Sequence, residues 1–331
     1  MELKGDIMRV AWFDTQDLEK EYIKDQDLDL EIDFFTEPLD KDTKSLVEDY
    51  DGVSVFLTSK VDRETIEGLN VDFIACRSTG VDHVDIKAAE EKGISVCNVP
   101  DYGAVTVAEH VFGLMLSLAR KIYYGIEKVK RGGFDREGLR GFDLDGKTLG
   151  VIGTGSIGKE VIKRARCFGM DVIGYDPYPD RDAERLLDFD YVEFDQVLEK
   201  SDIITLHSPL TEETRHMLSA EEFAKMNETL IINTSRGELI DTDALVKALN
   251  KGNVSAAGLD VLEEESINED LELLTETDGE NRFRTLLAEH RLLRREDVLI
   301  TPHNAFNSIE AQERIIDTTI RNMKGCTNVV N

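Results

Sequence analysis

Three side chains in the sequence, each shortly after an apolar segment, could together carry out acid/base chemistry. They are Arg236, Glu265 and His303. A guanidinium stays charged and binds a carboxylate through paired donors, whereas an imidazole gains or loses a proton near neutral pH. Oxidation of a hydroxy acid by hydride transfer needs a base for the hydroxyl proton and a cation for the carboxylate. These residue types therefore predict chemistry on a small hydroxy or keto acid.

The carboxylate of this set is one of three neighbours, because Glu263 and Glu264 directly precede Glu265. A carboxylate beside an imidazole stabilises the protonated ring, which favours the histidine as the acid when a keto acid is reduced. Residue type alone leaves the choice among the three open. The remaining histidines fit no metal-ligand spacing, and we predict no metal site. They are His83, His110, His207, His216 and His290.

A glycine-rich motif predicts a dinucleotide-binding turn. Gly153, Gly155 and Gly158 follow an apolar segment and open a helical one, which is the context that a GxGxxG motif requires. The first glycine permits a tight turn, the second lets the backbone approach a pyrophosphate, and the third allows close packing of helix and strand. The phosphates then lie at a helix N-terminus, where unpaired amides carry partial positive charge.

Asp176 lies 18 residues after the last glycine of the motif and ends an apolar segment. A carboxylate at this position accepts hydrogen bonds from a ribose hydroxyl and repels a 2′-phosphate. We therefore predict NAD rather than NADP as the cofactor. Arg181 lies close enough in the sequence to bind a phosphate instead.

Short apolar segments alternate with polar, helix-favouring ones, which predicts an α/β fold built on parallel sheets. Buried strands are expected near the start of the chain at Ile7–Phe13, Val53–Leu57, Phe73–Cys76 and Ile94–Val99. A second series of strands, which suits a nucleotide-binding sheet, is expected further along the chain. Its members are Thr148–Gly153, Asp171–Tyr175, Asp202–His207, Leu230–Thr234, Ser255–Asp260 and Val298–Thr301.

Two longer segments have a distinct character. The segment Val105–Lys130 is expected to form one helix that is apolar over most of its circumference and is therefore packed on most sides. We interpret it as the link into a second domain and as a subunit interface of a homodimer; a core helix is the alternative. The charge-rich segment Glu263–Glu296 is expected to be mostly a solvated helical insertion.

Composition limits the function classes. The 331-residue chain is 41% apolar and long enough for two domains with cores of their own. Its formal net charge of −29 repels nucleic acid and anionic membranes, so neither is an expected partner. A high-salt cytoplasm would explain this acidity, although composition does not prove it.

The N-terminal segment and the cysteines indicate a location. No apolar stretch approaches the length of a membrane span, and the first residues lack the apolar run of a signal peptide. The cysteines are widely spaced and form no ligand pattern, so we expect buried thiols in a reducing compartment. A cytoplasmic protein is therefore expected. The cysteines are Cys76, Cys97, Cys167 and Cys326.

Several motifs occur together in the order and spacing of one known family. They are Arg77–His83, Val107–His110, Val151–Gly158, Leu206–Leu210 and Asn233–Gly237. Together they resemble the D-isomer-specific 2-hydroxyacid dehydrogenases, and most closely the D-lactate dehydrogenase branch, over nearly the whole chain. The resemblance implies two Rossmann- or flavodoxin-like parallel-sheet domains with the active site in the cleft between them. An NAD-binding domain of residues 102–301 would be inserted into a substrate domain of residues 1–101 and 302–331.

The resemblance also implies a role for each catalytic residue. Arg236 would bind the carboxylate and carbonyl of the substrate, and His303 would act as acid and base. Glu265 would orient and charge the imidazole, because the family places this carboxylate five residues after the position of Asp260. The same spacing disfavours the two preceding glutamates.

Further contacts with substrate and cofactor follow from the same resemblance. The substrate carboxylate would meet the backbone amides of Thr79 and Gly80, with Tyr102 and Phe306 walling the pocket. Asp260 would bind the nicotinamide carboxamide. The full set of cofactor contacts would be Gly153, Gly155, Ser156, Ile157, Gly158, Asp176, His207, Ser208, Pro209, Thr234, Ser235, Arg236 and Asp260.

Some residues depart from the family pattern. Phe56 stands where the lactate branch commonly has a tyrosine near the substrate, and Ser266 where many relatives have proline. The 33 residues from Glu265 to Val298 resemble the lactate branch more than the shorter glycerate-type connection. We therefore predict an NAD-dependent dehydrogenase for D-lactate-like hydroxy acids and pyruvate-like keto acids.

Other functions stay open at this point. Hydroxypyruvate or glycerate is an alternative substrate, and an NAD-sensing, corepressor-like binding protein is an alternative without turnover. Oxidation of formate is disfavoured, because formate-oxidising relatives typically carry an amide in place of the glutamate assigned to Glu265.

Overall fold

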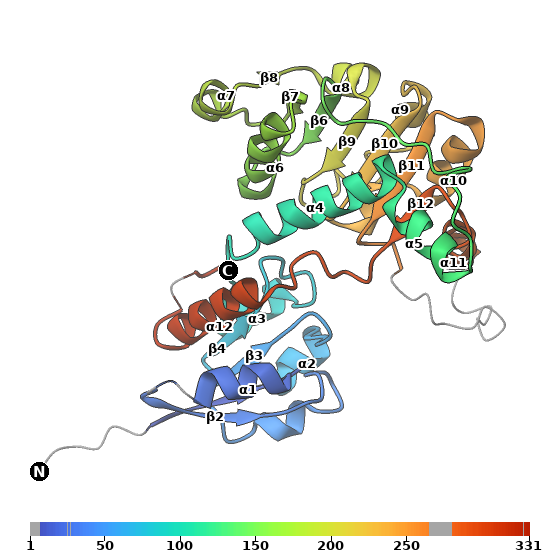
Figure 1. The fold of residues 1–331 in the computed structure, drawn as a ribbon. Coiled ribbons are helices and arrows are strands. Elements are labelled where there is room, and N and C mark those ends of the chain that lie inside the picture. Colours follow the sequence, from blue (N-terminus) through green and yellow to red (C-terminus); the bar gives the residue numbers. More distant parts are fainter. Residues whose placement is uncertain (1–6, 25, 27, 265–279, 327) are drawn as a thin grey trace, which may run out of the picture. The chain divides into compact units, whose positions relative to one another are not determined.

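The computed structural model describes residues 7–24, 26, 28–264, 280–326 and 328–331. The chain divides into two compact units. Unit 1 comprises Met1–Tyr102 and Asn307–Asn331, and unit 2 comprises Gly103–Phe306. Both units are α/β structures built on an entirely parallel sheet, as expected from the sequence (Figure 1).

Unit 1 contains a five-stranded sheet in the order β2-β1-β3-β4-β5. This order is that of the flavodoxin-like folds. The strands β3 and β4 are buried along their whole length, which accounts for their largely apolar sequence. The edge strand β2 alternates between buried and more exposed positions and was not predicted. The strands are β1 (Met8–Trp12), β2 (Leu30–Phe34), β3 (Gly52–Val55), β4 (Phe73–Cys76) and β5 (Ser95–Cys97).

Helices cover both faces of this sheet. The helices α1 (Asp17–Lys24) and α12 (Ile309–Met323) share one apolar core with alternate residues of β1 and β4. The helices α2 (Arg63–Gly68) and α3 (Ile86–Lys92) share a second core with the opposite residues of the same strands. A short 3-10 helix, η1 (Lys44–Val47), lies before β3. The last helix of the chain is therefore part of the N-terminal unit.

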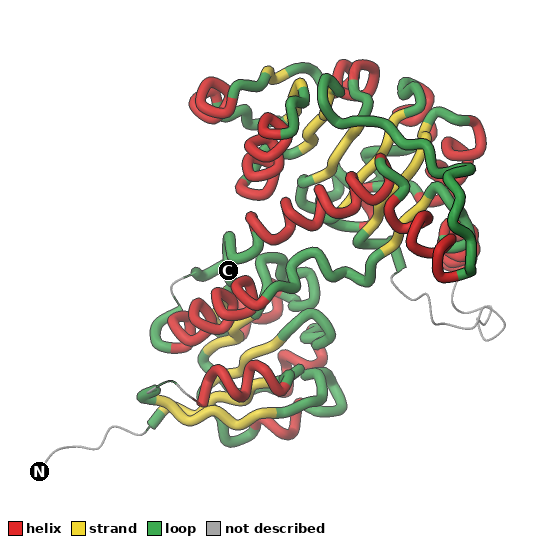
Figure 2. Tube along the Cα trace, in the orientation of Figure 1, coloured by secondary structure: helices red, strands yellow, loops and turns green. Residues whose placement is uncertain are grey.

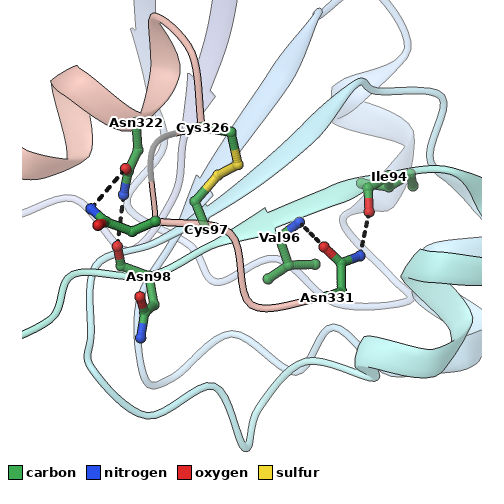
Figure 3. The surroundings of a disulfide bond; sticks show 8 residues. Ile94, Val96, Cys97, Asn98, Asn322, Cys326 and Asn331 are labelled. Atoms are coloured by element: carbon green, nitrogen blue, oxygen red, sulfur yellow. Dashed lines mark hydrogen bonds between the residues drawn. A yellow bond between two sulfur atoms is a disulfide. The ribbon is translucent and has the colours of Figure 1, made fainter.

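The expectation of four buried thiols is wrong for three of the cysteines. Cys97 and Cys326 form a disulfide, with a Cα–Cα distance of 5.7 Å (Figure 3). These two cysteines are 229 residues apart, and they meet because residues after α12 run antiparallel beside β5. Cys76 is a buried free thiol, as predicted, whereas Cys167 is free but exposed. Sequence spacing could not reveal the pairing, because it depends on where α12 packs.

Unit 2 contains a seven-stranded sheet in the order β12-β11-β10-β9-β6-β7-β8. The chain runs outward from β6 to β8 and then outward in the other direction from β9, so the order reverses between β6 and β9. Open α/β sheets bind ligands beyond the carboxyl ends of their strands at such a point. The two-residue β8 was not predicted. The strands are β6 (Thr148–Ile152), β7 (Asp171–Tyr175), β8 (Asp190–Tyr191), β9 (Ile203–Leu206), β10 (Thr229–Asn233), β11 (Val254–Leu259) and β12 (Val298–Ile300).

Helices also cover both faces of the second sheet (Figure 2). One core joins the sheet to α4 and α6, and the other joins it to α8, α9, α10 and α11. No helix in the described residues is long and apolar enough to cross a membrane. The helices are α4 (Ala104–Ala119), α5 (Ile122–Lys130), α6 (Ser156–Cys167), α7 (Arg181–Leu187), α8 (Phe194–Lys200), α9 (Ala220–Ala224), η2 (Gly237–Leu239), α10 (Thr242–Lys251) and α11 (Glu280–Leu292).

Two segment predictions in unit 2 need correction. The single helix expected over Val105–Lys130 is two helices, because Lys121 has a φ of 53° and breaks the helical path between α4 and α5. The segment Glu263–Glu296 contains a helix as expected, but where it is described this helix is not solvated on all sides, because Leu286, Ala288 and Leu292 of α11 are buried. Residues 265–279 lie outside the described part.

Candidate active site and dinucleotide site

The turn after β6 has the shape that the glycine motif predicted. Gly153 has a φ of 90°, and a Cβ there would lie 2.6 Å from the backbone of His207. A Cβ on Gly158 would lie 2.2 Å from the carbonyl oxygen of Gly153. A Cβ on Gly155 would meet nothing within 4 Å, so this residue faces open space just before the first turn of α6. The turn therefore leaves room for a pyrophosphate against the backbone, at a helix N-terminus.

Asp176 follows β7 directly beside this turn. Its carboxylate accepts hydrogen bonds from the backbone N–H of Thr154 at 2.8 Å and of Tyr178 at 2.9 Å. These bonds fix the carboxylate at the strand end where the ribose contact was predicted. Arg181, the nearby candidate for a phosphate ligand, forms an ion pair with Glu184 at 2.9 Å instead.

The end of β9 brings His207 under the glycine turn. The imidazole Nε2 lies 2.9 Å from the hydroxyl of Thr205, and burial lowers the pKa of His207 to about 3. The ring is therefore neutral at physiological pH. Ser208 and Pro209, the other predicted contacts after this strand, follow it in the same loop. The backbone of His207 and Ser208 is what a Cβ on Gly153 would strike.

The loop after β10 carries Thr234, Ser235 and Arg236. The buried hydroxyl of Thr234 has no hydrogen-bond partner among the described residues. An orphaned buried hydroxyl at a strand end suits a polar ligand group such as a carboxamide. Asn233 fixes the loop, because its side chain donates to the carbonyl oxygen of Arg236 at 2.8 Å and accepts from the N–H of Ser235 at 3.0 Å.

Asp260, at the end of β11, holds the loop that contains His303. Its carboxylate accepts hydrogen bonds from the N–H of Asn304 at 2.9 Å and of Ala305 at 2.8 Å. The hydroxyl of Thr301 donates to the same carboxylate, and the backbone N–H of His303 donates to the carbonyl oxygen of Asp260 at 2.8 Å. Asp260 is 1% exposed, and it therefore fixes the histidine loop from within the protein.

His110 on α4 completes this cluster. Its Nε2 lies 3.0 Å from the Thr301 hydroxyl and 3.4 Å from the Asp260 carboxylate. Burial opposes ionisation of Asp260, but the hydrogen bonds from His110, Thr301 and the two loop amides outweigh it and lower the pKa of this carboxyl. No role was predicted for His110, and its contact with Asp260 was missed because the two residues are 150 positions apart.

The backbone at His303 has a φ of 47°, in the left-handed region that a residue with a Cβ rarely adopts. The hydrogen bonds to Asp260 hold it there. Arg236, Glu263 and His303 follow three neighbouring parallel strands, β10, β11 and β12. The topology thus brings the loops predicted to carry the chemistry to one edge of one sheet.

The predicted catalytic carboxylate, Glu265, lies outside the described residues. The two alternatives are described, and each has an ion-pair partner. Glu263 contacts Nε2 of His216 at 2.6 Å and accepts from the N–H of Thr242 at 2.9 Å. Glu264 pairs with Arg282 at 2.9 Å.

A buried acid supports this loop from α11. Glu289 is 0% exposed, and its carboxyl group accepts a hydrogen bond from the N–H of Glu264 at 3.0 Å. Burial raises the pKa of Glu289 to about 7; the amide of Glu264 opposes this rise, and the charges of Glu263 and Glu264 add to it. The loop after β11 therefore rests on a carboxyl group that titrates near neutral pH.

In unit 1, residues 78–80 form the loop predicted to bind the substrate carboxylate, called here the carboxylate loop. It follows β4 after a single residue, Arg77. The hydroxyl of Ser78 donates to the carbonyl oxygen of Gly80 at 2.6 Å, and that of Thr79 donates to the carbonyl oxygen of Val99 at 2.8 Å. The backbone amides of Thr79 and Gly80 donate to no acceptor within the described part of the chain. Two adjacent N–H groups of this kind suit a carboxylate.

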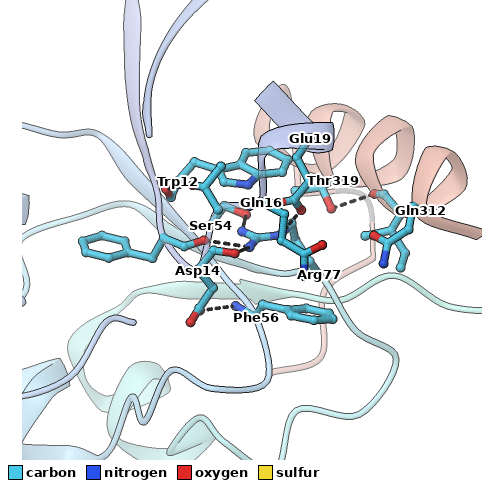
Figure 4. Close-up of polar contacts among 12 residues, drawn as sticks. Trp12, Asp14, Gln16, Glu19, Ser54, Phe56, Arg77, Gln312 and Thr319 are labelled. Carbon is cyan, nitrogen blue, oxygen red and sulfur yellow. Dashed lines mark hydrogen bonds and ion pairs between the residues drawn. The ribbon is translucent and has the colours of Figure 1, made fainter. Parts of the chain in front are cut away.

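Arg77, immediately before the carboxylate loop, is almost fully buried at 1% exposure (Figure 4). Its guanidinium donates to the Ser54 hydroxyl at 2.9 Å and to the carbonyl oxygen of Phe13 at 2.6 Å. It also pairs with Glu19 at 3.2 Å and lies 4.6 Å from the ring centroid of Trp12. The ends of β1, β3 and β4 are thus tied together by one cation. Sequence reasoning missed this role, because arginine is rarely buried.

The remaining predicted substrate contacts lie in different units. Tyr102 ends the first segment of unit 1, where its carbonyl oxygen accepts from Nε of Arg314 at 2.7 Å. Phe306 ends unit 2, three residues after His303. Phe56, the residue that departs from the family pattern, follows β3; its N–H donates to the Asp14 carboxylate at 3.0 Å, and its ring lies 5.6 Å from the guanidinium carbon of Arg77. In the described residues, no cluster of three or more potential metal ligands occurs.

The chain is similar to a known family model and to several known proteins. Residues 112–305 match the model of the D-isomer specific 2-hydroxyacid dehydrogenase, NAD binding domain. The D-lactate dehydrogenase of Escherichia coli is 36% identical over 96% of this chain and 96% of its own. The hydroxypyruvate reductase of Thermotoga maritima is 40% identical over 86% of this chain and 88% of its own. The crystal structure of D-lactate dehydrogenase from Aquifex aeolicus, complexed with NAD and lactic acid, is similar with a TM-score of 0.80 and 32% identity, covering 95% of this chain and 94% of that one.

Proposed function

The chain belongs to the D-isomer-specific 2-hydroxyacid dehydrogenases, which are NAD-dependent oxidoreductases, and on this basis we propose that it interconverts a short 2-keto acid such as pyruvate and the corresponding D-2-hydroxy acid. The observation that carries the proposal is the placement of the loops with Arg236 and His303 at the carboxyl ends of β10 and β12, on either side of β11, in the same parallel sheet whose strand β6 carries the glycine turn. D-lactate dehydrogenases among the relatives favour a pyruvate-sized substrate, and a hydroxypyruvate reductase among them keeps that substrate as an alternative.

Each catalytic residue has a proposed task. Arg236 binds the substrate carboxylate and polarises the carbonyl through its planar pair of donors. His303 gives a proton to the carbonyl oxygen in reduction and takes it from the hydroxyl in oxidation. Glu265 stabilises the protonated imidazole. Bound NAD supplies the hydride acceptor in oxidation and, as NADH, the hydride donor in reduction.

The substrate contacts in unit 1 are part of the same proposal. The free amides of Thr79 and Gly80 would hold the second end of the substrate carboxylate, and Tyr102 and Phe306 would shield the pocket from water. A phenylalanine at position 56 lacks a hydroxyl, so this side of the pocket would favour an apolar substituent such as the methyl group of pyruvate.

The cofactor contacts are proposed for the residues around the glycine turn. Gly155 and the start of α6, with Ser156, Ile157 and Gly158, suit the pyrophosphate, and Asp176 suits the ribose. The loop after β9 would border the adenosine, and Thr234, Ser235, Arg236 and Asp260 would lie at the nicotinamide end. Because Asp176 is negatively charged and Arg181 is paired with Glu184, NADPH should be disfavoured.

The decisive experiment measures steady-state oxidation of NADH with pyruvate, 2-ketobutyrate, hydroxypyruvate, phenylpyruvate and 2-ketoisocaproate. We expect pyruvate or 2-ketobutyrate to give the highest kcat/KM, and NADPH to give a lower kcat/KM than NADH. His303→Gln should lower kcat by a factor of about a hundred while NADH binding survives. Turnover of none of these acids would refute the substrate proposal, and equal use of NADPH would refute the role of Asp176.

The choice of carboxylate has its own test. Glu265→Gln keeps the shape of the side chain but removes its charge, so keto-acid reduction should fall off at lower pH than in the parent. Glu264→Gln serves as the matched control, because it removes the charge of the neighbouring side chain. A shifted pH profile of kcat/KM in Glu264→Gln alone would assign the role to Glu264.

We further propose a homodimer formed through unit 2. The helix α5 exposes an apolar face of Ile122, Tyr123, Ile126 and Val129, each 47–54% exposed. A cavity of about 540 Å³ lies next to this face between α4, α5 and β12. Such a face on a water-exposed helix favours association. A monomeric mass in light scattering at micromolar concentration, in low and in high salt, would contradict this. We also propose a cytoplasmic location, where NAD and NADH are available to a dehydrogenase.

A further inference from the structure

The last residues of the chain fasten the edge strand β5 (Figure 3). Val329 pairs with Cys97 in an antiparallel bridge, and the N–H of Val330 donates to the carbonyl oxygen of Val96 at 2.9 Å. The side chain of Asn331 accepts from the N–H of Val96 at 3.0 Å and donates to the carbonyl oxygen of Ile94 at 2.8 Å. The edge of the sheet in unit 1 is thus satisfied by the C-terminal residues.

The C-terminal segment also holds Asn98, the residue that follows Cys97. The main chain of Asn98 is held twice: its N–H donates to the carbonyl oxygen of Asn328 at 3.1 Å, and its carbonyl oxygen accepts from Nδ2 of Asn322 at 2.7 Å. The side chain of Asn328 also donates to Oδ1 of Asn322 at 3.1 Å. The covalent bond between Cys97 and Cys326 joins the same two segments. The position of Asn98 therefore depends on the end of α12 and the residues beyond it.

Asn98 in turn reaches the carboxylate loop. Its Nδ2 donates to the carbonyl oxygen of Thr79 at 2.8 Å. The next residue, Val99, donates its N–H to the carbonyl oxygen of Ser78 at 3.0 Å and accepts from the Thr79 hydroxyl at 2.8 Å. The carbonyl oxygens of the loop are thus engaged on one side, and the amides of Thr79 and Gly80 stay available on the other. A peptide plane held by its carbonyl oxygen presents the following N–H in a fixed direction.

We propose that Asn98 is a positioning residue for the carboxylate loop, and that the Cys97–Cys326 disulfide is a redox-controlled clasp that keeps Asn98 in place. The inference rests on the proposed function only in taking residues 78–80 as the ligand of the substrate carboxylate. The NAD-binding unit contains neither cysteine, so the clasp acts on keto-acid binding and leaves cofactor binding unchanged.

The exposure of the two cysteines determines which sulfur atom an incoming thiolate can attack. Cys97 is 0% exposed, whereas Cys326 is partly exposed, so an incoming thiolate reaches the Cys326 sulfur. A cellular dithiol would attack this sulfur and form a mixed disulfide, while Cys97 leaves as a thiolate and takes up a proton. The second thiol of the dithiol then releases Cys326 and becomes oxidised, so two electrons and two protons pass to the protein. A low-molecular-weight disulfide would restore the bond by the reverse exchange.

A disulfide in a cytoplasmic enzyme is unusual unless it serves such a role. Opening the clasp removes a covalent constraint from a short segment whose other contacts are individual hydrogen bonds. We expect the carboxylate loop to become more mobile and the KM for the keto acid to rise by up to about tenfold on reduction. The Kd of NADH should not change.

The test uses the enzyme with all four cysteines in place, oxidised with glutathione disulfide or reduced with dithiothreitol. Mass spectrometry of unreduced peptides first establishes the Cys97–Cys326 link. Hydrogen exchange of the peptide that contains residues 78–80 and the KM for pyruvate are then measured in both forms, with NADH binding followed by fluorescence. The reduced form should show faster exchange and a higher KM. Equal exchange and equal KM in the two forms would overturn the proposal, as would absence of the linked peptide.

Two pairs of variants separate the parts of the proposal. Cys326→Ser should behave like the reduced enzyme in the absence of dithiothreitol, whereas Cys167→Ser, which removes the exposed free thiol, should respond to dithiothreitol like the parent. Asn98→Asp keeps the shape but cannot donate to Thr79, so it should show rapid loop exchange even when oxidised. Asn70→Asp adds the same charge at an exposed site of unit 1 and should have no effect.

The design distinguishes failure of the clasp from failure of the proposed function. If keto acids are turned over but neither exchange nor KM responds to reduction or to Asn98→Asp, the clasp is wrong and the function stands. If no keto acid is turned over while exchange at residues 78–80 does respond, the clasp holds the loop but the loop does not serve this substrate.

Discussion

Unit 1 and unit 2 each bury one charged side chain at the carboxyl end of a strand, and the two charges are of opposite sign. Arg77 follows β4 immediately before the carboxylate loop, whereas Asp260 follows β11 and accepts hydrogen bonds from the loop of His303. Each is 1% exposed, and each is satisfied by several hydrogen bonds. The buried charge of unit 2 thus binds a predicted substrate loop directly, whereas that of unit 1 ties together the strand ends next to such a loop.

The two arrangements differ in how they respond to pH. Burial lowers the pKa of Arg77, but a guanidinium remains protonated at neutral pH, and its partners are a carboxylate, a hydroxyl and main-chain carbonyl oxygens. The loop after β11 in unit 2 instead contacts Glu289, whose pKa is raised by burial to about 7. The strand ends of unit 1 are therefore joined by a permanent charge, whereas the loop after β11 rests on a group whose charge changes near neutral pH.

The largest expected effect comes from removing the cation in unit 1. Arg77→Met leaves Glu19 buried without its partner and should lower the free energy of unfolding of unit 1 by about 3–5 kcal/mol. Trp12, the single tryptophan of the chain, lies against Arg77 and reports urea unfolding of this unit by fluorescence. Arg63→Met removes an exposed ion pair with Glu91 and should lower the free energy of unfolding far less.

Adding Glu19→Gln to Arg77→Met should restore part of the lost stability, since it removes the uncompensated charge. Equal losses in Arg77→Met and Arg63→Met would show that the buried cation is not what supports unit 1. A strong pH dependence of the Arg77→Met effect between pH 6 and 8 would contradict the contrast between the units.

The next effect concerns the buried acid of unit 2. The raised pKa of Glu289 means that the folded state favours the protonated form, so its ionisation destabilises the fold progressively from about pH 4.5 to above pH 7. Glu289→Gln should remove this penalty and stabilise unit 2 by up to about 3 kcal/mol at pH 8, with little effect at pH 4. Urea unfolding followed by far-UV circular dichroism at the two pH values measures it. Glu296→Gln, at an exposed site, is the control; a Glu289→Gln variant that is less stable at pH 8 would refute the assignment.

Replacing the buried carboxylate at β11 should affect catalysis. Asp260→Asn places an amide N–H group against the backbone donors of the histidine loop, where one of them loses its acceptor. Displacement of His303 should then lower kcat by a factor of about 10 to 100. Steady-state kinetics at saturating NADH measure this loss, with Asp297→Asn in the same unit as the control. An unchanged kcat would mean that Asp260 does not set the position of His303.

The smallest expected effect is at His110. His110→Leu removes one of several donors around Asp260, and the Thr301 hydroxyl and two backbone amides remain. We expect kcat to fall only by a factor of about 3 to 10, which corresponds to loss of one hydrogen bond. His110→Gln should recover part of this loss, because its amide can donate to Thr301. A larger loss of kcat in His110→Leu than in Asp260→Asn would show that His110 contributes more than Asp260 to the position of the histidine loop.

The fold was predictable from the sequence where strands are buried on both faces. The segments around β3, β4, β6 and β10 are mostly apolar, and their strands lie within a few residues of the expected bounds. The edge strands β2 and β8 were missed, since β2 carries acidic residues and β8 has only two residues. Their strand conformation depends on pairing with a neighbour, which a local pattern does not encode.

In the candidate site, too, features with a local sequence pattern were predictable, and those that depend on distant residues were not. The glycine turn was predictable, because the positive φ of Gly153 and the close contact of Gly158 with Gly153, which require glycine there, involve a short stretch of the sequence. The support of the predicted loops by Arg77, Glu289 and the Cys97–Cys326 disulfide was not. Each of these depends on contacts between residues far apart in the sequence, and a buried arginine or glutamate resembles a solvated one when only its letter is known.

The left-handed backbone at His303 has a consequence for how the chain tolerates change. A non-glycine residue in this conformation costs about 1–2 kcal/mol, and the hydrogen bonds that the loop amides donate to Asp260 maintain it. Asparagine or glycine at position 303 would relieve the strain but remove the imidazole. Selection for stability and selection for turnover thus oppose each other at this residue. Screens of random variants for heat resistance alone should therefore enrich inactive chains substituted at position 303.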